Sequence, residues 1–275
     1  MNQKPLLTVI TATYNSSASI ERCLQSVENQ SYPFIEHIVI DGNSTDTTTE
    51  IIEEYASHVS SRISHWISEP DKGVYDAWNK ALPHIKGDWV CFLGSDDFYL
   101  SNDTFDKAVE HLISASAKTK IAYGKIIVFD QSLDNILYTR GCPWTTAKKS
   151  FFKGVMIPHP AVFHRAEIFK TYGSFDINYR IAGDYEMLMR ILKDTIPEYM
   201  DIPIVMMQFG GASSKPETLI QSGEEMLSAF KKNNIQNTEG FSLKLRILKF
   251  GSFLSPKLTA STSRFIWDVK LKRMR

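Results

Sequence analysis

Short apolar runs alternate with helical patterns over the first 100 positions of the chain. Runs of consecutive apolar residues, which we expect to form buried strands, occupy residues 6–11, 37–40, 65–67 and 89–93. Apolar residues recur at helical spacing in residues 20–27, 51–59 and 74–85. Strands that alternate with helices are typical of βα units on a mainly parallel sheet. The pattern therefore predicts an α/β fold for this half.

Polar residues ahead of two of these helices carry capping signals. Ser16, Ser17 and Ser19 precede the helical pattern that begins at residue 20. Thr47 and Glu50 have the spacing of a capping box, in which the two residues bond each other's backbone N–H groups. We therefore expect the second helix to start at this box.

The pattern is less regular beyond residue 100. It predicts helices at residues 104–114 and 184–193 and strands at residues 121–129, 136–139 and 161–164. No internal repeat and no low-complexity linker separates the two halves. We expect the second half to be a less regular region added to the first.

Composition is typical of a cytosolic protein. At 275 residues, with 43% hydrophobic and 23% charged residues, the chain can bury a full core. It has no run of about 18 uncharged apolar residues, and its start lacks the features of a signal peptide. Cys23, Cys91 and Cys142 form no CxxC pair, and Cys23 and Cys91 lie in apolar patterns, so we interpret all three as small buried apolar residues rather than disulfides or metal ligands. This interpretation suits a reducing compartment.

The net charge of zero conceals an uneven distribution. Residues 241–275 hold nine Lys or Arg residues and one acidic residue, Asp268, so this tail carries +8 and the rest of the chain −8. The tail is also rich in Phe, Leu, Ile and Trp. Two interpretations remain open: contact with an anionic membrane surface or acidic partner, and a solvated amphipathic helix that packs on the domain. We expect no nucleic-acid partner.

Polar residues follow four of the expected strands, where they occupy residues 11–15, 41–44, 69–71 and 95–97. In open α/β sheets, ligands bind outside the carboxyl ends of the strands, so these residues define a candidate site. Neither GxGxxG nor GxxxxGK[ST] occurs, which argues against a dinucleotide dehydrogenase and a P-loop enzyme.

Adjacent carboxylates at the end of a buried strand make Asp96 and Asp97 candidate ligands for Mg²⁺ or Mn²⁺, since hard oxygen ligands suit those ions. Alternatively, the pair is a loop cap for the helix that follows Asn102. Asp41 is open to two interpretations as well. Its carboxylate can accept hydrogen bonds from a nucleobase, or it can close the strand as an Asx-turn.

Two prolines flank His159, and they fix the backbone so that the ring can point into the candidate site. The alternative is a structural histidine whose hydrogen bonds are satisfied within the fold. Trp78, Trp89 and Trp144 can stack on a sugar or base, but Trp78 and Trp89 fit core patterns, and packing is the better interpretation for both.

Six stretches together resemble family 2 glycosyltransferases of the bacterial surface-polysaccharide type, in the family's order and spacing. They are TVITATYN (8–15), HIVIDGNSTDTT (37–48), ISEPDKGVYDAWNKAL (67–82), GDWVCFLGSDD (87–97), HPAVFHR (159–165) and AGDYEMLMR (182–190). The resemblance covers roughly residues 6–210. It implies the GT-A fold, a Rossmann-like, mainly parallel sheet flanked by helices, here followed by a C-terminal amphipathic helical tail.

The resemblance also implies roles for individual residues. Those that would bind the nucleotide-sugar are Thr11, Thr13, Tyr14, Asn15, Asp41, Asp71, Asp76, Lys80, Ser95, Asp96 and His159. Asp96 and Asp97 would hold the metal, Mn²⁺ or Mg²⁺, and Asp184 falls where the family places its catalytic base. From the residues alone, an Asp that opens a helix is usually a cap.

This sequence departs from the family's pattern at three places. Many members read DDG where this chain has Asp41-Gly42-Asn43, and DxDD where it has Gly94-Ser95-Asp96-Asp97. The acidic pair that often contains the base is Gly183-Asp184 in this chain. One carboxylate is therefore absent from each of these motifs.

The resemblance implies an inverting, metal-dependent, hexosyltransferase-type enzyme with a nucleotide diphosphate donor, by default a UDP-sugar. Its acceptor would be a saccharide or polyprenyl-linked saccharide in cell-surface polysaccharide synthesis. The alternative is a catalytically weak or inactive nucleotide-sugar-binding module, which the absence of one carboxylate from each of the three acidic motifs suggests.

The resemblance also implies how the chain is divided. We expect a nucleotide-sugar-binding half (1–100), an acceptor and catalytic half of the same domain (101–215), and a basic helical tail (216–275). We expect a cytoplasmic protein, peripheral at the inner face of the plasma membrane if residues 241–275 contact it.

Overall fold

The computed structural model describes residues 4–130, 135–210, 216–236 and 238–254. Within these ranges, nine strands form one sheet in the order β3-β2-β1-β4-β8-β6-β9-β5, and β7 pairs with β6. The strands are β1 (Leu7–Thr13), β2 (Ile35–Asp41), β3 (Ile63–Ser68), β4 (Trp89–Gly94), β5 (Phe98–Tyr99), β6 (Ile121–Phe129), β7 (Ile136–Arg140), β8 (Val162–Arg165) and β9 (Glu198–Gln208).

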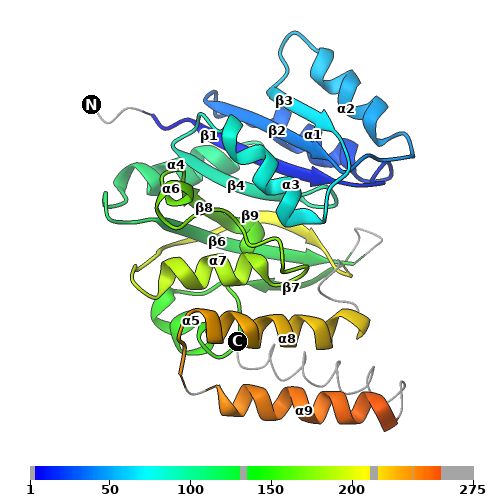
Figure 1. The fold of residues 1–275 in the computed structure, drawn as a ribbon. Helices are drawn as coiled ribbons and strands as arrows, with labels where there is room; N and C mark the ends of the chain where they lie inside the picture. Colours follow the sequence, from blue (N-terminus) through cyan, green and yellow to red (C-terminus); the bar gives the residue numbers. More distant parts are fainter. Residues whose placement is uncertain (1–3, 131–134, 211–215, 237, 255–275) are drawn as a thin grey trace.

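Helices cover both faces of this sheet (Figure 1). The α-helices are α1 (Ile20–Glu28), α2 (Thr48–Ser57), α3 (Val74–Ala81), α4 (Thr104–Ser114), α5 (Trp144–Phe151), α6 (Ile168–Thr171), α7 (Gly183–Leu192), α8 (Pro216–Lys232) and α9 (Glu239–Leu254). Short 3₁₀ turns at Leu82–His84 and His159–Ala161 follow α3 and precede β8.

The first four strands form the parallel half of the sheet. β1 pairs in parallel with β2 and with β4, and β2 pairs in parallel with β3. β8 then lies antiparallel between β4 and β6, and β9 runs parallel to β6. The expected α/β architecture is confirmed, with a mainly parallel first half and a mixed second half.

Neighbouring residues of β1 point into two different cores, because successive side chains of a strand face opposite sides of the sheet. Val9 packs with the buried side chains of α1 and α4, and Ile10 packs with those of α3 and α7. Both residues are fully buried. Burial on both faces explains why the parallel strands read as continuous apolar runs in the sequence.

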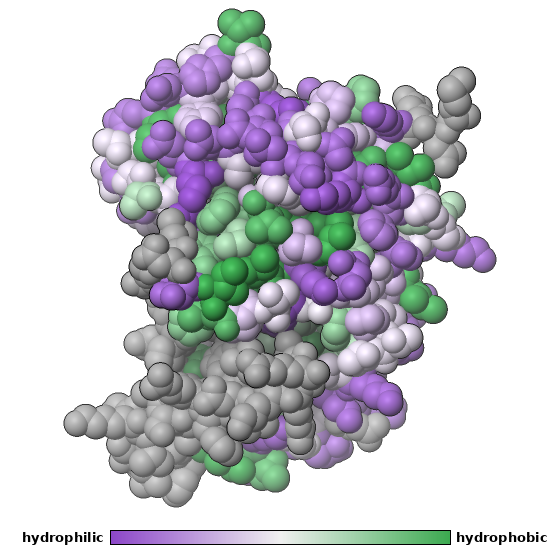
Figure 2. Space-filling view, turned by 180° about the vertical axis from the view of Figure 1, so that it is seen from behind, coloured by the Kyte–Doolittle hydropathy of each residue, from purple (hydrophilic) through white to green (hydrophobic). Residues whose placement is uncertain are grey.

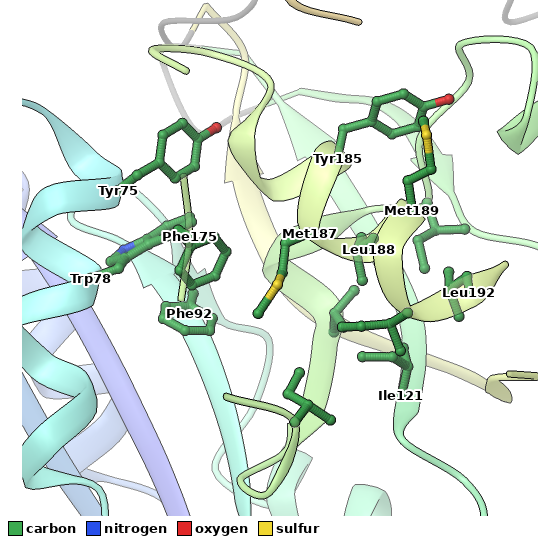
Figure 3. Close-up of a cluster of buried hydrophobic side chains, with 14 of the residues drawn as sticks. Tyr75, Trp78, Phe92, Ile121, Phe175, Tyr185, Met187, Leu188, Met189 and Leu192 are labelled. Atoms are coloured by element: carbon green, nitrogen blue, oxygen red, sulfur yellow. The ribbon is translucent and has the colours of Figure 1, made fainter. Parts of the chain in front are cut away.

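The core on the α3 and α7 side is rich in aromatic rings. Tyr75 and Trp78 of α3 lie edge to face with ring centroids 5.4 Å apart, and Phe175 packs against both. Figure 3 shows this group beside the apolar side chains of α7. The contact joins the first half of the chain to the second.

The structure confirms the expected strands and helices over residues 6–129, apart from their end residues. The expected capping interactions are not formed, however. Ser19 and Thr47 are the N-caps of α1 and α2, and neither side chain bonds its helix. At α2, Asp46 takes this place, since its carboxylate accepts hydrogen bonds from the N–H and the hydroxyl of Thr48.

The last described part of the chain is a pair of helices, α8 and α9. α8 lies beside α7 (Figure 1), and Leu245 of α9 packs against Gly223 of α8. Among the described helices, none has both the length and the apolar character that crossing a membrane requires. Residues 255–275 of the predicted basic tail lie outside the described residues.

Candidate active site

Strand register brings the polar strand ends together. Thr13 at the end of β1 pairs with Asp41 at the end of β2, and Asp41 pairs with Ser68 at the end of β3. On the other side of β1, Ala12 pairs with Gly94 at the end of β4. All four strand ends therefore lie side by side at one edge of the parallel half, as we expected from the sequence.

The loops after β1 and β2 are joined to each other by hydrogen bonds. The N–H of Asn15 donates to Ser44 Oγ at 2.8 Å, and Asn15 Oδ1 accepts from the N–H of Thr45 at 2.8 Å. Asn15 has φ +47°, a left-handed conformation that asparagine tolerates. Next to it, the side chain of Tyr14 is 61% exposed. The two loops form one wall of the site and leave the Tyr14 ring at its surface.

Two of the predicted donor-binding side chains are turned into the protein. Thr11 is fully buried, and its hydroxyl lies 2.9 Å from His37 Nε2 within the core. Asp41 is also fully buried, and its Oδ2 accepts from the N–H of Ser44 at 2.8 Å and from the hydroxyl of Ser68 at 2.6 Å. Asp41 thus closes the strand as a turn residue, which is one of its two interpretations from the sequence.

The predicted donor-binding residues at and near the turn before α3 form hydrogen bonds mainly within that turn. Asp71 Oδ1 accepts from the N–H of Gly73 at 2.7 Å, and Asp76 accepts from the N–H of Lys72 at 3.0 Å. Lys80 Nζ donates to the carbonyl of Pro70 at 2.7 Å. These contacts fix the turn at the end of β3.

Asp96 and Asp97 converge on the space above Gly94. A Cβ atom at position 94 would lie 3.0 Å from Asp96 Oδ1 and 3.1 Å from Asp97 Oδ2. Asp97 is 6% exposed, and burial, together with the nearby Asp96, raises its pKa well above the usual range. Two close carboxylates, of which Asp97 is buried, favour a bound cation because it offsets their mutual repulsion. They do not cap the next helix, because Asp103 is the N-cap of α4.

Ser95 and the end of β9 support this pair of carboxylates from two sides. The hydroxyls of Ser95 and Ser16 lie 2.9 Å apart, which links the loop after β4 to the loop after β1. The N–H of Gln208 donates to Asp97 Oδ1 at 3.2 Å. Within the described ranges, no group of three or more His, Cys, Asp and Glu side chains is arranged to hold a metal ion.

Asp184 lies at the start of α7, next to the first turn of α3. Its Oδ1 accepts from the N–H of Tyr185 at 2.8 Å and lies 3.1 Å from the hydroxyl of Tyr75. The side chain is partly exposed, but the protein surrounds its carboxyl group, and this loss of hydration raises the pKa of Asp184 to about 6. It is therefore ionised at neutral pH and able to accept a proton.

His159 lies beneath the site rather than at its surface. It is 4% exposed, and its ring stacks on Trp78 with centroids 5.2 Å apart and packs against Phe92. Burial lowers the pKa of His159 well below its usual range, and Nε2 has no hydrogen-bond partner in the described residues. The ring is neutral and forms part of the aromatic core.

The tryptophans pack as well. Trp78 is 9% exposed, Trp89 1% and Trp144 7%. Packing was the interpretation for the first two, and it holds for Trp144 too, whose ring contacts Phe151.

Two neighbours of Asp184 could not be predicted from the sequence pattern. Tyr75 bridges Asp184 and the carbonyl of Ile181, and it comes from a helix 109 residues earlier in the chain. Burial lowers the pKa of Arg140 at the end of β7, and the nearby Asp184 carboxylate is among the groups that oppose this effect. No local pattern signals such contacts, because each depends on how distant elements pack.

The chain is similar in sequence to known glycosyltransferases. The family model described as glycosyl transferase family 2 matches residues 8–173. A PGL/p-HBAD biosynthesis glycosyltransferase of Mycobacterium bovis is 30% identical over 224 residues, which are 76% of this chain and 80% of the relative. The putative teichuronic acid biosynthesis glycosyltransferase TuaG of Bacillus subtilis is 39% identical over 115 residues, 42% of this chain and 45% of TuaG.

Solved structures share the fold at lower identity. TarS 1–349 of S. aureus, in complex with UDP-GlcNAc, matches with a TM-score of 0.63 and 20% identity over 86% of this chain and 69% of that chain. The mannosyltransferase PcManGT of Pyrobaculum calidifontis, in complex with GDP-Man and Mn²⁺, matches with a TM-score of 0.60 and 17% identity over 98% of this chain and 81% of that chain. Both support the GT-A architecture.

Proposed function

The chain belongs to glycosyltransferase family 2, and from this premise we propose that it is an inverting transferase whose catalytic base is Asp184. The reaction would move a sugar from a nucleotide diphosphate donor, by preference a UDP-sugar, to a hydroxyl group of the acceptor. The observation that carries the proposal is the position of Asp184. It is a carboxylate with little hydration at a helix start, beside the edge where the parallel strands end.

The proposed chemistry needs a single displacement. Asp184 removes the proton of the acceptor hydroxyl as the hydroxyl oxygen bonds to the anomeric carbon, and the bond from that carbon to the diphosphate breaks. Attack on the face opposite the leaving group inverts the configuration. A positioned base of this kind contributes about 10²- to 10⁴-fold to the rate.

We propose that the donor lies along the strand ends. On this proposal, Tyr14 and Asn15 contact the nucleotide from the loop after β1, and Asp71 contacts it from the turn after β3. Thr13, the last residue of β1, is only 5% exposed and would lie beneath them. Thr11, Asp41 and His159 would support this surface from below, since all three are buried. On this proposal the nucleotide-sugar-binding half is residues 1–100, and residues 101–215 supply the base and the acceptor side.

Asp96 and Asp97 fit a divalent cation, Mn²⁺ or Mg²⁺, because their carboxylates converge above Gly94. Such ions are commonly held by one or two carboxylates, with phosphate and water oxygens completing the shell. When bound, the ion supplies positive charge that stabilises the leaving diphosphate. PcManGT, whose structure contains Mn²⁺ with GDP-Man, supports this assignment.

For the acceptor, we propose a saccharide or polyprenyl-linked saccharide used in cell-surface polysaccharide synthesis. Support comes from the similarity to TuaG, which is named for teichuronic acid biosynthesis. We also propose contact with the inner face of the plasma membrane through the basic segment 241–275. Its described part, in α9, exposes Leu243 and Ile247 next to Lys244 and Arg246.

The test is a panel of UDP-, dTDP- and GDP-sugars offered to purified protein with Mn²⁺, with Mg²⁺ or with EDTA. We expect binding and slow hydrolysis of one donor class, both dependent on the divalent ion. Asp184→Asn should abolish transfer and hydrolysis but bind the donor as the wild type does. Asp194→Asn is the matched control, because Asp194 follows α7 and is exposed.

Two results would contradict the proposal. Donor binding without turnover in the wild type would instead support a nucleotide-sugar-binding module that has lost catalysis. Equal loss of donor binding and transfer in Asp184→Asn would remove Asp184 from the role of base, because a base is not required for donor binding.

A further inference from the structure

α8 lies outside the six sequence stretches and outside the matched residues 8–173, yet it meets the site next to the proposed base. Figure 1 shows α8 alongside α7, and Glu225 projects from α8 to the turn that leads into α7. This contact joins the C-terminal helical region to the proposed catalytic centre.

The carboxylate of Glu225 accepts hydrogen bonds from three successive backbone N–H groups. Its Oε1 accepts from Arg180 at 3.1 Å, and its Oε2 accepts from Ile181 and from Ala182, both at 2.8 Å. Gln221, one turn earlier in α8, donates to Oε1 at 3.0 Å. Successive backbone N–H groups that converge on one anion form a nest, which holds a negative charge firmly.

The nest ends at the helix that carries Asp184. Ala182 is the N-cap of α7, so the Glu225 carboxylate lies at the positive end of the helix dipole. Asp184 follows Ala182 by two residues. Any movement of the turn at 180–182 therefore moves the Asp184 carboxyl group with it.

α8 has other anchors to the domain. Ala229 and Phe230 are buried in the core, and the Phe230 ring packs edge to face with Tyr185 of α7. Lys232 pairs with Asp176 at 2.8 Å. Because these contacts already dock the helix, the Glu225 nest is not needed merely to attach α8.

We propose that Glu225 is a positioning residue for the transfer reaction, which holds the turn 180–182 and thereby fixes the place and orientation of Asp184. The inference rests on the proposed function of Asp184 as base. A misplacement of about 1 Å in a reacting group can cost about 10²-fold in rate. The hydrogen bond from Ala182 to Glu225 fixes the backbone two residues before Asp184, so we expect its loss to have a large effect on catalysis.

Glu225 also acts on Asp184 through its charge. Among the described residues, Tyr75 of α3 contacts Asp184, and Glu225 of α8 and Arg140 of β7 interact with it through their charges. Burial is the main cause of the raised pKa of Asp184, and the negative charge of Glu225 raises it further. Removal of that charge should therefore lower the pKa of Asp184.

The experiment compares Glu225→Gln with Glu224→Gln. Glu224 is the neighbouring residue of α8, is exposed and pairs with Lys249, so it controls for the loss of one negative charge on this helix. For Glu225→Gln we expect unchanged donor affinity, a fall in kcat of about tenfold or more, and an acid limb of the pH–rate profile that moves to lower pH. Glu224→Gln should match the wild type in all three.

Hydrogen exchange at the amides of Arg180, Ile181 and Ala182 gives a readout that does not depend on activity. Exchange should become faster at these amides in Glu225→Gln and stay unchanged in Glu224→Gln. If the wild type transfers no sugar, the proposed function fails, while these amides still report whether Glu225 holds the turn.

The proposal would be overturned if Glu225→Gln folds and has the same kcat as the wild type, with the acid limb of its pH–rate profile at the same pH. If that variant does not fold, Gln221→Ala replaces it, because it removes only the hydrogen bond to Glu225 Oε1 and keeps the charge. We then expect a smaller fall in kcat with the acid limb unmoved, and an unchanged kcat would overturn the proposal.

Discussion

At the scale of single residues, two glycines of the candidate site leave room for nearby carboxylates. A Cβ atom at Gly42 would lie 2.7 Å from Asp71 Oδ2, and one at Gly94 would meet both Asp96 and Asp97. The motifs around these glycines looked short of acids in the sequence. In the folded chain, Asp71 from the turn after β3 occupies the space beside Gly42, and Asp96 and Asp97 of the same motif occupy the space beside Gly94.

The pH dependence of transfer follows from the environment of Asp184. Because its pKa is raised to about 6, the carboxyl group is protonated at lower pH and cannot accept a proton from the acceptor. We expect kcat/KM for the acceptor to rise with pH through a midpoint near pH 6 and then to level off, since this ratio reports the pKa values of the enzyme before the acceptor binds. The measurement is a pH–rate profile at saturating donor and Mn²⁺.

Saturating Mn²⁺ keeps a second carboxyl group out of this profile. Burial also raises the pKa of Asp97, but a bound cation favours its ionised form. An acid limb centred near pH 4 would mean that Asp184 behaves as an ordinary carboxyl group, and the assigned environment would then be incorrect.

Several candidate residues were predicted from sequence, but their orientations were not. The strand-end location of Thr11 and Asp41 is as expected, whereas their side chains turn into the core. Alternation along β1 decides this for Thr11, and the hydrogen bonds of Ser44 and Ser68 decide it for Asp41. Such contacts depend on register between strands, which a single chain's pattern does not specify.

At the scale of elements, the start of α7 is fitted closely against α3. Gly183 is buried under the ring of Tyr75, and a Cβ atom at this position would lie 2.7–2.9 Å from ring carbons. Tyr75 is 3% exposed and is packed by Phe175 on its other side, so the ring has little room to move. A glycine is required here for the two helices to approach.

We therefore expect Gly183→Ala to destabilise the protein and reduce transfer. Overpacking of this kind typically costs about 1–3 kcal/mol, and a displaced Tyr75 would also release its hydrogen bond to Asp184. Urea denaturation and kcat measure the two effects. The control is Gly240→Ala in α9, where no atom lies within 4 Å of the added Cβ. Wild-type stability in Gly183→Ala would show that the junction is looser than this packing indicates.

Strands and helices were predictable where the hydrophobic pattern was regular, and β9 shows why others were not. Its sequence EYMDIPIVMMQ contains Asp201 and Pro203, which argue against a strand. In the structure, β9 pairs with β6 and shifts register around the pairing of Lys125 with Pro203. The irregular pairing accommodates a proline that has no N–H to donate. Tertiary pairing, rather than local propensity, makes this segment a strand.

At the scale of the whole molecule, hydrophilic and hydrophobic residues occupy different parts of one face. Figure 2 shows hydrophilic residues over the half formed by β1–β4 and a band of hydrophobic residues across the middle of that face. The charge is divided as well, with +8 in residues 241–275 and −8 in the rest. On the proposed membrane contact, the basic segment 241–275 would be attracted to an anionic surface.

α9 has features of both interpretations of the basic tail, the docked helix and the membrane contact. Leu245 is 7% exposed and packs against α8, as expected for a helix docked on the domain. Leu243 is 59% exposed and Ile247 63%, one turn apart on another side of the helix. Two apolar side chains beside exposed basic residues are typical of helices that lie in a membrane interface.

We expect the full chain to bind vesicles that contain anionic lipid, more weakly as salt is raised and not at all when the lipid is neutral. The salt dependence follows because screening weakens the attraction of lysine and arginine to the surface. Replacement of Leu243 and Ile247 by Gln should weaken binding, since it removes the apolar contact and leaves the charge unchanged. Vesicle cosedimentation measures both effects.

A matched control distinguishes membrane contact by α9 from nonspecific binding by any exposed apolar side chain. Ile196 lies in the loop between α7 and β9 and is 74% exposed, more than Leu243 or Ile247. Ile196→Gln should therefore leave vesicle binding unchanged if α9 makes the contact. Equal binding by the α9 double variant and the wild type would instead mean that α9 is only a docked helix with solvated charges. In that case, the acceptor would have to reach Asp184 without help from a membrane contact of this helix.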